Sequence, residues 1–335
     1  MVGIGSSHLR TDDALLRVGD LVVEFETSGG TVQAVSQVSF DVQEGETLGI
    51  VGESGCGKST TAKAVVQLPR PKAGTVEYRR SRLDADATDL NTLPDAELRA
   101  VRRDLQMIFQ DPISSLNPRR SVRQIIREGV DIWGTSGEWS EARLDDLMNQ
   151  VGIAPKYGDR RPYQFSGGQC QRISIARALA LDPRLLISDE PVSALDVSVQ
   201  AQILNLLDDL QREHSLTMLF ISHDLAVVRN ISDRVMVMYL GRVAEIGDAD
   251  ALFSNAAHPY TQALLSAVPG SGVDDDRSLS GELPSPLDPP PGCRFHTRCA
   301  YATEICETTI PEFAQHGDDH WVACHHVQSV PVAIS

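Results

Sequence analysis

The chain has 335 residues, of which 41% are hydrophobic and 23% charged, so it can bury a large core and has the balance of an ordinary soluble protein. Its formal net charge of −16 argues against a generic nucleic-acid binder, which usually carries a basic stripe, and against direct docking on anionic lipids. The N-terminal segment has no apolar stretch of the kind found in secretory signals, and the longest apolar run, Leu216 to Ile221, is too short to cross a bilayer. We therefore expect a soluble, cytoplasmic chain that reaches a membrane only through partners.

The first part of the chain predicts two strands, then a strand, a glycine-rich loop and a helix. Residues 15–26 and 35–43 alternate in hydrophobicity as strands do, with a Ser-Gly-Gly turn at 28–30 between them. An apolar strand is predicted at 47–51 and a helix at 58–68. A strand, a glycine loop and a helix in this order are the context that a phosphate-binding P-loop needs.

The middle of the chain predicts a helical insertion in an α/β core. A short charged helix at 94–103 and a buried strand at 105–109 precede a polar, helical pattern from 111 to about 163. The core is predicted to resume with a helix at 169–181, a strand at 184–188, a helix at 198–213, a strand at 216–222 and a hairpin at 236–246.

Changes in composition predict the domain boundaries. The α/β core is expected to comprise residues 1–110 and 176–268, with a helical subdomain at 111–175 between its two parts. Residues 269–291 are rich in Pro, Gly, Ser and Asp, which is typical of a linker. The cysteine-rich tail, residues 292–335, is then expected to form a small separate domain that binds metal.

The segment GESGCGKST at 52–60 matches the P-loop pattern G-x4-G-K-S. Its glycines let backbone N–H groups turn inward around phosphate oxygens, next to the N-terminus of the following helix. Lys58 would bridge the β- and γ-phosphates, and Ser59 would bind Mg²⁺. The expected nucleotide contacts are Gly52, Ser54, Gly55, Cys56, Gly57, Lys58, Ser59 and Thr60.

The segment LLISDE is an apolar run that ends in two carboxylates, Asp189 and Glu190. Asp189 would lie on the Mg²⁺ side, and Glu190 would act as the general base that orients the attacking water. A solvated acidic turn is the alternative for this stretch taken alone.

A third motif is a glycine-flanked helix start formed by Ser166, Gly167, Gly168 and Gln169. It fits the capping box S-x-x-[EQ], so helix initiation alone could explain it. In the functional interpretation, the N–H groups and the hydroxyl bind a γ-phosphate. Because the P-loop helix already serves its own nucleotide, this second anion site would serve a neighbouring subunit, which implies a sandwich dimer.

The order of these motifs is more specific than any one of them. Across about residues 15–265 the chain resembles the ATP-binding subunits of ATP-binding-cassette (ABC) transporters. The resemblance implies a P-loop (RecA-like) α/β core with an inserted helical subdomain. It identifies FSGGQ as the family signature, Gln110 as the Q-loop, Ser193 to Asp196 as the D-loop and His223 as the switch histidine.

The resemblance also implies roles for single residues. Glu190, Gln110 and His223 are the expected catalytic residues, and none of them is degenerate, so ATP hydrolysis is expected. Mg²⁺ would be bound by Ser59, Gln110 and Asp189, and Asp196 would join the signature residues as a nucleotide contact. Phe25 is the candidate for stacking on adenine, with Val32 as an aliphatic alternative, and Cys170 replaces the bulky residue that commonly follows the signature.

Five segments are similar in particular to the peptide-importer ATPases of the dipeptide/oligopeptide group: GESGCGKST (52–60), FQDPISSLNPR (109–119), DEPVSALDVSVQAQILNLL (189–207), HPYTQALLSAVP (258–269) and GELPSPLDPPPGC (281–293). This similarity implies ATP-driven peptide import at the cytoplasmic face of the cell membrane. The implied partners are a second, related ATPase chain in a heterodimer, two transmembrane permease subunits and an extracytoplasmic substrate-binding protein, with no nucleic acid. The same architecture also imports nickel or oligosaccharides, and a soluble ABC protein in DNA repair or translation is the alternative from another class.

The tail carries the spacing Cys293-x5-Cys299-x6-Cys306-x17-Cys324, which lacks the C-x2-C knuckles of most structural zinc sites. Loops of this irregular length suit four thiolates that converge on a [4Fe–4S] cluster, and the peptide-importer ATPases that the chain resembles include members with such a cluster here. Zinc remains the alternative, as do thiols without metal. The histidines that could join a zinc site are His296, His320, His325 and His326.

Overall fold

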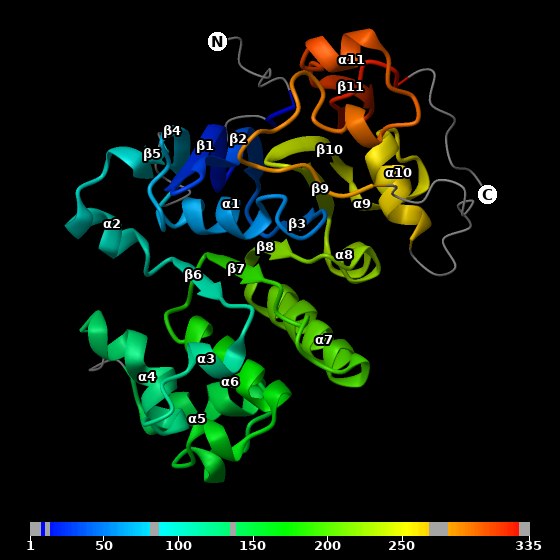
Figure 1. Ribbon diagram of the computed structural model, residues 1–335. Coiled ribbons are helices and arrows are strands. Elements are labelled where there is room, and N and C mark those ends of the chain that lie inside the picture. Colours follow the sequence, from blue (N-terminus) through cyan, green and yellow to red (C-terminus); the bar gives the residue numbers. More distant parts are fainter. Residues whose placement is uncertain (1–7, 11–13, 81–86, 135–138, 268–280, 328–335) are drawn as a thin grey trace. The chain divides into compact units, whose positions relative to one another are not determined.

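The computed structural model describes residues 8–10, 14–80, 87–134, 139–267 and 281–327 (Figure 1). The chain divides into two compact units. The first unit is Met1–Leu93 with Ser222–Ser335, and the second unit is Pro94–Ile221. This division differs from the predicted domain boundaries, which stay predictions. The predicted linker residues 269–280 and the end of the tail at 328–335 lie outside the described residues.

One sheet of the first unit is antiparallel, in the order β2 (Gly30–Val42), β1 (Leu16–Thr27), β4 (Ala73–Tyr78) and β5 (Thr88–Asp89). β1 and β2 form a hairpin, paired from Leu16 with Val42 to Thr27 with Gly30. The second strand starts earlier than the predicted 35–43, because pairing with β1 carries a polar, part-exposed stretch into the ladder.

The other sheet of the first unit follows the order β11 (Ala314–Gly317), β12 (His320–Val322), β10 (Arg242–Asp248), β9 (Arg234–Tyr239) and β3 (Thr47–Val51). β3 runs parallel to β9, and the other neighbours are antiparallel. Every residue of β3 is buried, as its apolar sequence predicts. The helices of this unit are α1 (Lys58–Val65), α8 (Leu225–Ile231), α9 (Ala249–Ser254), α10 (Pro259–Ser266) and α11 (Glu304–Thr308).

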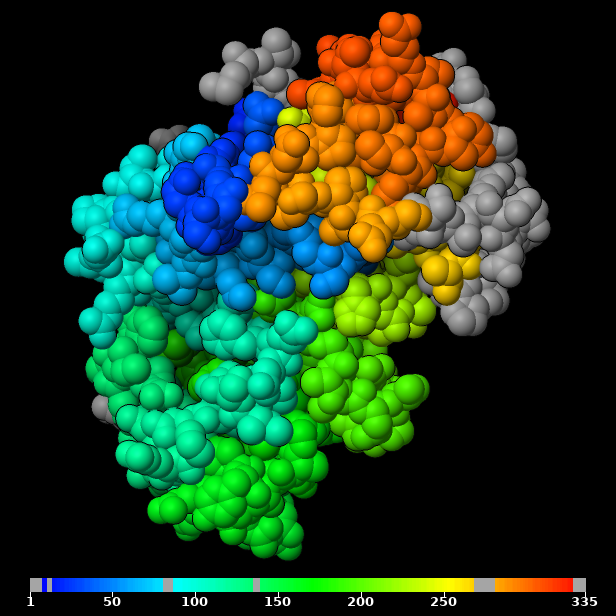
Figure 2. Space-filling view, viewed as in Figure 1, coloured from blue at the N-terminus to red at the C-terminus, as the bar shows by residue number. Residues whose placement is uncertain are grey.

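Strands of the cysteine-rich tail belong to this sheet, so the expected separate tail domain is not supported. β12 pairs with β10, with Glu245 opposite Val322 and Ile246 opposite Trp321. Figure 2 shows the tail, in orange to red, against the blue N-terminal strands, where the backbone of Gln33 donates to the carbonyl of Pro286 at 3.0 Å. The physical reason is size: such short elements bury too little apolar surface to be stable alone, and they gain a core by extending an existing sheet.

The second unit contains a parallel sheet and a set of helices. The strands lie in the order β8 (Thr217–Ile221), β7 (Leu185–Asp189) and β6 (Leu105–Ile108). The helices are α2 (Asp95–Val101), α3 (Pro112–Ser115), α4 (Val122–Ile132), α5 (Glu141–Gln150), α6 (Gly167–Leu179) and α7 (Val197–His214). The α/β sheet and the helical stretch from 111 onward agree with the mixed P-loop fold expected from the sequence. In the described part of the chain, no helix is both long and apolar enough to cross a membrane.

Candidate nucleotide site

The P-loop connects β3 to α1, as the sequence predicts. Its backbone is left-handed at Gly52 (φ 147°) and Gly57 (φ 106°). A Cβ atom at Gly52 would lie 2.1 Å from the carbonyl oxygen of Met238, and one at Gly57 would lie 2.4 Å from that of Ala34. Both positions therefore require glycine for conformation and for space.

Lys58 is held inside this loop. Its Nζ donates to the carbonyl oxygens of Gly52 at 2.7 Å and Glu53 at 3.0 Å, and the residue is only 4% exposed. Burial raises the pKa of the Cys56 thiol, so this side chain stays protonated near neutral pH and packs within the loop. The other predicted contacts follow the loop and the first turn of α1: Ser54, Gly55, Ser59 and Thr60.

His223 is exposed in the first unit, on a segment attached to the strand that carries the P-loop. The backbone N–H of Ser222 donates to the carbonyl of Ile50 in β3 at 3.2 Å. On its other side, Asp224 is the N-cap of α8, and its carboxylate accepts from the N–H of Ala226 at 2.9 Å. The histidine is thus fixed at both flanks while the residue itself is exposed.

In the second unit, Gln110 and Glu190 meet at the carboxyl ends of two neighbouring parallel strands. β6 and β7 are paired up to Ile108 and Ser188, so both chains leave the sheet at the same edge. Gln110 Nε2 donates to Glu190 Oε2 at 3.1 Å. Asp189, the last residue of β7, is 3% exposed. Two motifs that were separate in the sequence are therefore side by side.

The signature residues begin α6. Ser166 is the N-cap, and its hydroxyl accepts from the N–H of Gln169 at 3.4 Å while Gln169 Oε1 accepts from the N–H of Ser166 at 3.0 Å. The capping box is thus formed, and it leaves the serine exposed at the helix start. A Cβ atom at Gly168 would lie 2.3 Å from Val199 Cγ1, so this glycine allows α6 to approach α7 closely.

The D-loop ends where α7 begins. Asp196 is the N-cap of α7, and its Oδ1 accepts from Ser198 Oγ at 2.7 Å and from the N–H of Val199 at 3.0 Å. These hydrogen bonds lower the pKa of Asp196, so the carboxylate stays ionised. At the start of the loop, Ser193 Oγ donates to the carbonyl of Glu190 at 3.1 Å, which fixes the backbone next to the proposed base.

The predicted site residues therefore belong to two units. The first unit brings together the P-loop and His223, and the second brings together Gln110, Asp189, Glu190, the signature and the D-loop. Contacts that would join the two parts, such as Asp189 and Ser59 on one Mg²⁺, stay predictions.

The two candidates for adenine stacking lie on one patch. Phe25 in β1 pairs directly with Val32 in β2, so their side chains share a face of the hairpin. Phe25 is 40% exposed, which is uncommon for a phenylalanine on a strand. Cys170, by contrast, is 1% exposed in α6 with its Sγ donating to the carbonyl of Pro162 at 3.5 Å, as expected of a packing residue.

The tail cysteines lie near one another as free thiols. The N–H of Cys293 donates to the carbonyl of Cys306 at 2.8 Å. Burial, together with the neighbouring cysteines, raises the pKa of Cys293 and of Cys324 to about 11. Among the described residues, however, no group of three or more His, Cys, Asp or Glu side chains is arranged to hold a metal ion. The arrangement does not support the metal-binding tail that the spacing predicts.

Each of the nearby histidines has a hydrogen-bond partner for one ring nitrogen. His320 is 2% exposed and its Nε2 lies 2.7 Å from Glu245 Oε1. Each of the other three has a ring nitrogen within hydrogen-bond distance of a protein oxygen: His296 with the carbonyl of Cys293, His325 with the carbonyl of Thr309 and His326 with the hydroxyl of Thr303.

The structure adds residues that the motifs did not indicate. The N–H of Glu53, in the P-loop, donates to the hydroxyl of Tyr260 at 2.8 Å, and the Glu53 carboxylate pairs with Arg298 of the tail. Tyr260 lies in the segment HPYTQALLSAVP, which supported the resemblance without indicating a role for it. No local pattern in the sequence could place Arg298 beside a loop 245 residues earlier.

A P-loop at the end of a buried strand, an acidic strand end in contact with a glutamine and a capped glycine helix start define an ATP-binding cassette. A family model described as ABC transporter matches residues 35–193, and one described as oligopeptide/dipeptide transporter, C-terminal region, matches residues 244–306. The chain is 51% identical over 309 residues to the oligopeptide transport ATP-binding protein AppF of Bacillus subtilis (strain 168), covering 90% of this chain and 92% of that protein. It is 50% identical over 313 residues to the oligopeptide transport ATP-binding protein OppF of Escherichia coli (strain K12), covering 89% and 92%.

Among solved structures, the dimeric post-hydrolysis state of the ATP-binding cassette MJ0796 bound to ADP and Pi has a TM-score of 0.62 at 28% identity, covering 70% of this chain and 98% of that one. The chain belongs to the ABC transporter family, among its oligopeptide/dipeptide transport ATP-binding proteins.

Proposed function

We propose that this chain is the ATP-hydrolysing subunit of a membrane importer for dipeptides or oligopeptides. The observation that carries the ATPase proposal is the hydrogen bond between Gln110 and Glu190, because it joins a proposed Mg²⁺ ligand to the proposed general base at one strand edge. The peptide cargo is supported by the similarity to oligopeptide transport proteins over nine-tenths of the chain.

The residues divide the chemistry between them. The P-loop amides and Lys58 would hold the phosphates, and Ser59, Asp189 and Gln110 would hold Mg²⁺, which neutralises the charge on the transferred group. Glu190 would orient and deprotonate the attacking water. His223, exposed beside the P-loop strand, would contact the γ-phosphate edge.

The proposed dimer needs the signature of one subunit and the P-loop of the other. Support comes from α6, which presents a second glycine-rich helix start, capped by Ser166 and with this serine exposed, in addition to the P-loop helix. We propose a related, non-identical ATPase as the second chain.

The membrane partners would be two permease subunits and an extracytoplasmic binding protein, which places the ATPase at the cytoplasmic face of the membrane. Phe109 and Ile113 support a permease contact on the loop after Gln110, because they are 41% and 61% exposed. Nickel or oligosaccharide as cargo is not favoured, because the similar proteins are oligopeptide and dipeptide transport ATP-binding proteins.

Glu190→Gln tests the ATPase proposal. The variant should still bind ATP but lose at least about a hundredfold in turnover, because it cannot accept the proton from water. Glu213→Gln, at an exposed position on α7, is the matched control and should retain turnover. Unchanged hydrolysis in Glu190→Gln would contradict the assignment.

For the cargo, turnover of the assembled complex should be stimulated by peptides and not by nickel or oligosaccharides.

We further propose that the four tail cysteines hold a [4Fe–4S] cluster. A cubane is larger than a single ion and spaces its thiolates farther apart. The absence of a compact ion site among the described residues therefore counts against zinc more than against a cluster. Cys293 and Arg242 line the same small cavity of about 30 Å³. Arg242 Nε and Nη1 are buried there and have no hydrogen-bond partner in the described structure. A buried, unpaired cation suits an anionic group bound at Cys293.

Metal analysis of the anaerobically purified full chain tests this proposal. About four irons and four acid-labile sulfides per chain are expected, and Cys299→Ser should lose them while Cys170→Ser, outside the tail, should not. One zinc without sulfide, or no metal, would contradict the cluster and leave the ATPase proposal unaffected.

A further inference from the structure

The tail is connected to the P-loop by a part-buried ion pair within the first unit. Arg298 ends the short 3-10 helix His296–Arg298. Its two terminal nitrogens donate to the two carboxylate oxygens of Glu53, at 2.6 Å and 3.2 Å. The Arg298 side chain is 5% exposed and that of Glu53 is 26% exposed. A bidentate, largely desolvated pair of this kind is stronger than an ordinary surface ion pair.

Glu53 is itself part of the phosphate-binding loop. Its N–H donates to the hydroxyl of Tyr260 at 2.8 Å, and its carbonyl accepts from Lys58 Nζ at 3.0 Å. The position of Glu53 therefore affects the ammonium group that is proposed to bind the β- and γ-phosphates. A displacement of the Glu53 side chain would therefore act on Lys58 through the backbone carbonyl of Glu53.

Arg298 has a rigid support on its other side. It lies 3.4 Å from the hydroxyl of Tyr239. The ring of Tyr239 packs against Tyr260 and Phe295, with centroids 4.7 Å and 5.2 Å away. Because an arginine guanidinium stays protonated at physiological pH, Arg298 offers Glu53 a permanent positive charge.

Glu53 places a negative charge in a loop that is proposed to bind polyphosphate. A carboxylate without a counter-ion at this position of the P-loop would repel an anionic ligand and so weaken nucleotide binding. Pairing with Arg298 neutralises this carboxylate and keeps it turned toward the tail. The tail thereby removes an electrostatic obstacle from the nucleotide site.

We propose that Arg298 is a positioning residue for ATP binding: acting through Glu53, it neutralises and orients the P-loop. The inference rests on the proposed ATPase function. It makes the tail a contributor to nucleotide affinity, so that displacement of the segment around Cys299 weakens ATP binding while the chemical step at Gln110, Glu190 and His223 is preserved.

Three variants of the full chain distinguish this role from simple packing. Arg298→Gln leaves the Glu53 carboxylate unpaired, and we expect the Kd for ATP to rise by about tenfold or more, with kcat at saturating ATP changed little. Glu53→Gln removes the repelling charge and should weaken binding less. The double variant Glu53→Gln/Arg298→Gln should recover most of the affinity lost in Arg298→Gln. If the pair served only to attach the tail, the double variant would bind ATP as poorly as Arg298→Gln.

The controls separate this inference from the function on which it rests. Lys72→Gln, which breaks an exposed ion pair with Glu24 in the same unit, should leave the Kd unchanged. Arg298→Lys keeps the charge without the bidentate geometry, and its Kd for ATP should lie between those of the wild type and Arg298→Gln. If Arg298→Gln folds poorly, the Kd of Arg298→Lys tests the positioning role instead. An unchanged Kd in well-folded Arg298 variants would overturn the inference. Absence of ATP binding by the wild-type chain would instead overturn the proposed function.

Discussion

Glu190 combines a chemical role that the sequence indicates with a backbone conformation that it does not. Its φ of 48° is left-handed, which is uncommon for a residue other than glycine and recurs at functional sites. The strain is held by the hydrogen bond from its N–H to the carbonyl of Ile221 at 3.0 Å and by the bond from Ser193 Oγ to its carbonyl. The turn directs the carboxylate toward Gln110, so the conformation supports the assignment of Glu190 as the base.

His258 is a residue whose burial makes the fold sensitive to acid. It is 3% exposed, it is the N-cap of α10, and its Nδ1 accepts from the N–H of Tyr260 at 3.0 Å. Burial lowers the pKa of His258 to about 4 and outweighs the opposite effect of Glu245. The native histidine is therefore neutral over a range in which the unfolded chain is protonated.

Stability should consequently fall as the pH falls from 6.5 toward 4, because the unfolded state then binds a proton that the folded state excludes. Over the whole interval the loss from this residue amounts to about 3 kcal/mol. His258→Asn keeps an acceptor at the N-cap without the titration, so its urea midpoint should depend less steeply on pH. Equal pH slopes for wild type and His258→Asn would contradict this origin.

At the scale of elements, the start of α6 is both a helix cap and a proposed phosphate site, and substitutions of Ser166 can separate these two roles. Ser166→Ala should lose the cap and about 1 kcal/mol of stability. Ser166→Asp should keep the cap, since aspartate is a good N-cap, but should lose at least about tenfold in ATP turnover because its charge repels a phosphate.

Ser140, the N-cap of α5, provides the matched control for this experiment. Its Ala and Asp variants should change the thermal midpoint in the same way as those of Ser166 and leave ATP turnover unchanged. Full turnover in Ser166→Asp would mean that the residue is a helix cap and nothing more.

Elements with strong local patterns could be predicted, and elements that depend on distant partners could not. The apolar strand at 47–51 and the glycine loop after it match the structure because burial and backbone conformation are encoded locally. β12 has only three residues and exists because β10 offers it an edge. For the same reason the sequence places Gln110 and Glu190 in motifs but cannot show that their side chains touch.

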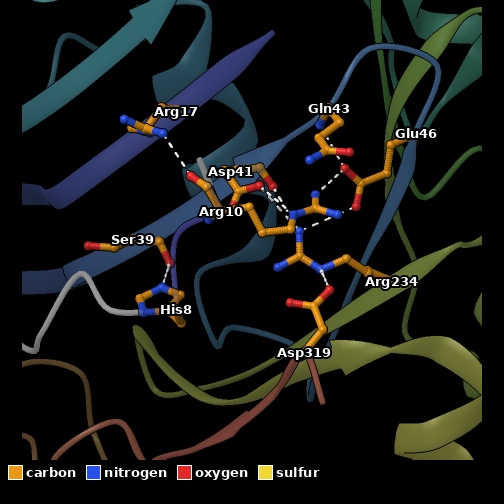
Figure 3. A network of polar contacts seen from close by, with 9 residues as sticks. All are labelled: His8, Arg10, Arg17, Ser39, Asp41, Gln43, Glu46, Arg234 and Asp319. Atoms are coloured by element: carbon orange, nitrogen blue, oxygen red, sulfur yellow. Dashed lines mark hydrogen bonds and ion pairs between the residues drawn. The ribbon is translucent and has the colours of Figure 1, made fainter. Parts of the chain in front are cut away.

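At the scale of the whole molecule, a buried charge cluster connects distant parts of the chain within the first unit (Figure 3). Arg234 in β9 is 3% exposed and lies 3.4 Å from Asp41 Oδ2 and 3.3 Å from Glu46 Oε1. Arg10, from the N-terminal segment, also pairs with both carboxylates, at 2.9 Å for Asp41. Asp319, between β11 and β12 of the tail, lies 3.5 Å from Arg234 Nε. The cluster therefore ties both ends of the described chain to the core sheets.

Arg234→Met should destabilise the protein strongly, because it leaves Asp41, which is fully buried, and Glu46 with Arg10 as their remaining cation in the cluster. Removal of one partner from a buried ion pair typically costs about 3–5 kcal/mol, and we expect a loss of this size in urea unfolding. Lys72→Met, which breaks an exposed pair, should cost less than about 1 kcal/mol. Arg234→Lys should fall between the two, since it keeps a charge but cannot reach both carboxylates and Asp319 at once. If Arg234→Met unfolded at the same urea concentration as Lys72→Met, the cluster would contribute no more than a surface ion pair, and the attachment of the tail would have to depend on the β10–β12 pairing and the Arg298–Glu53 contact instead.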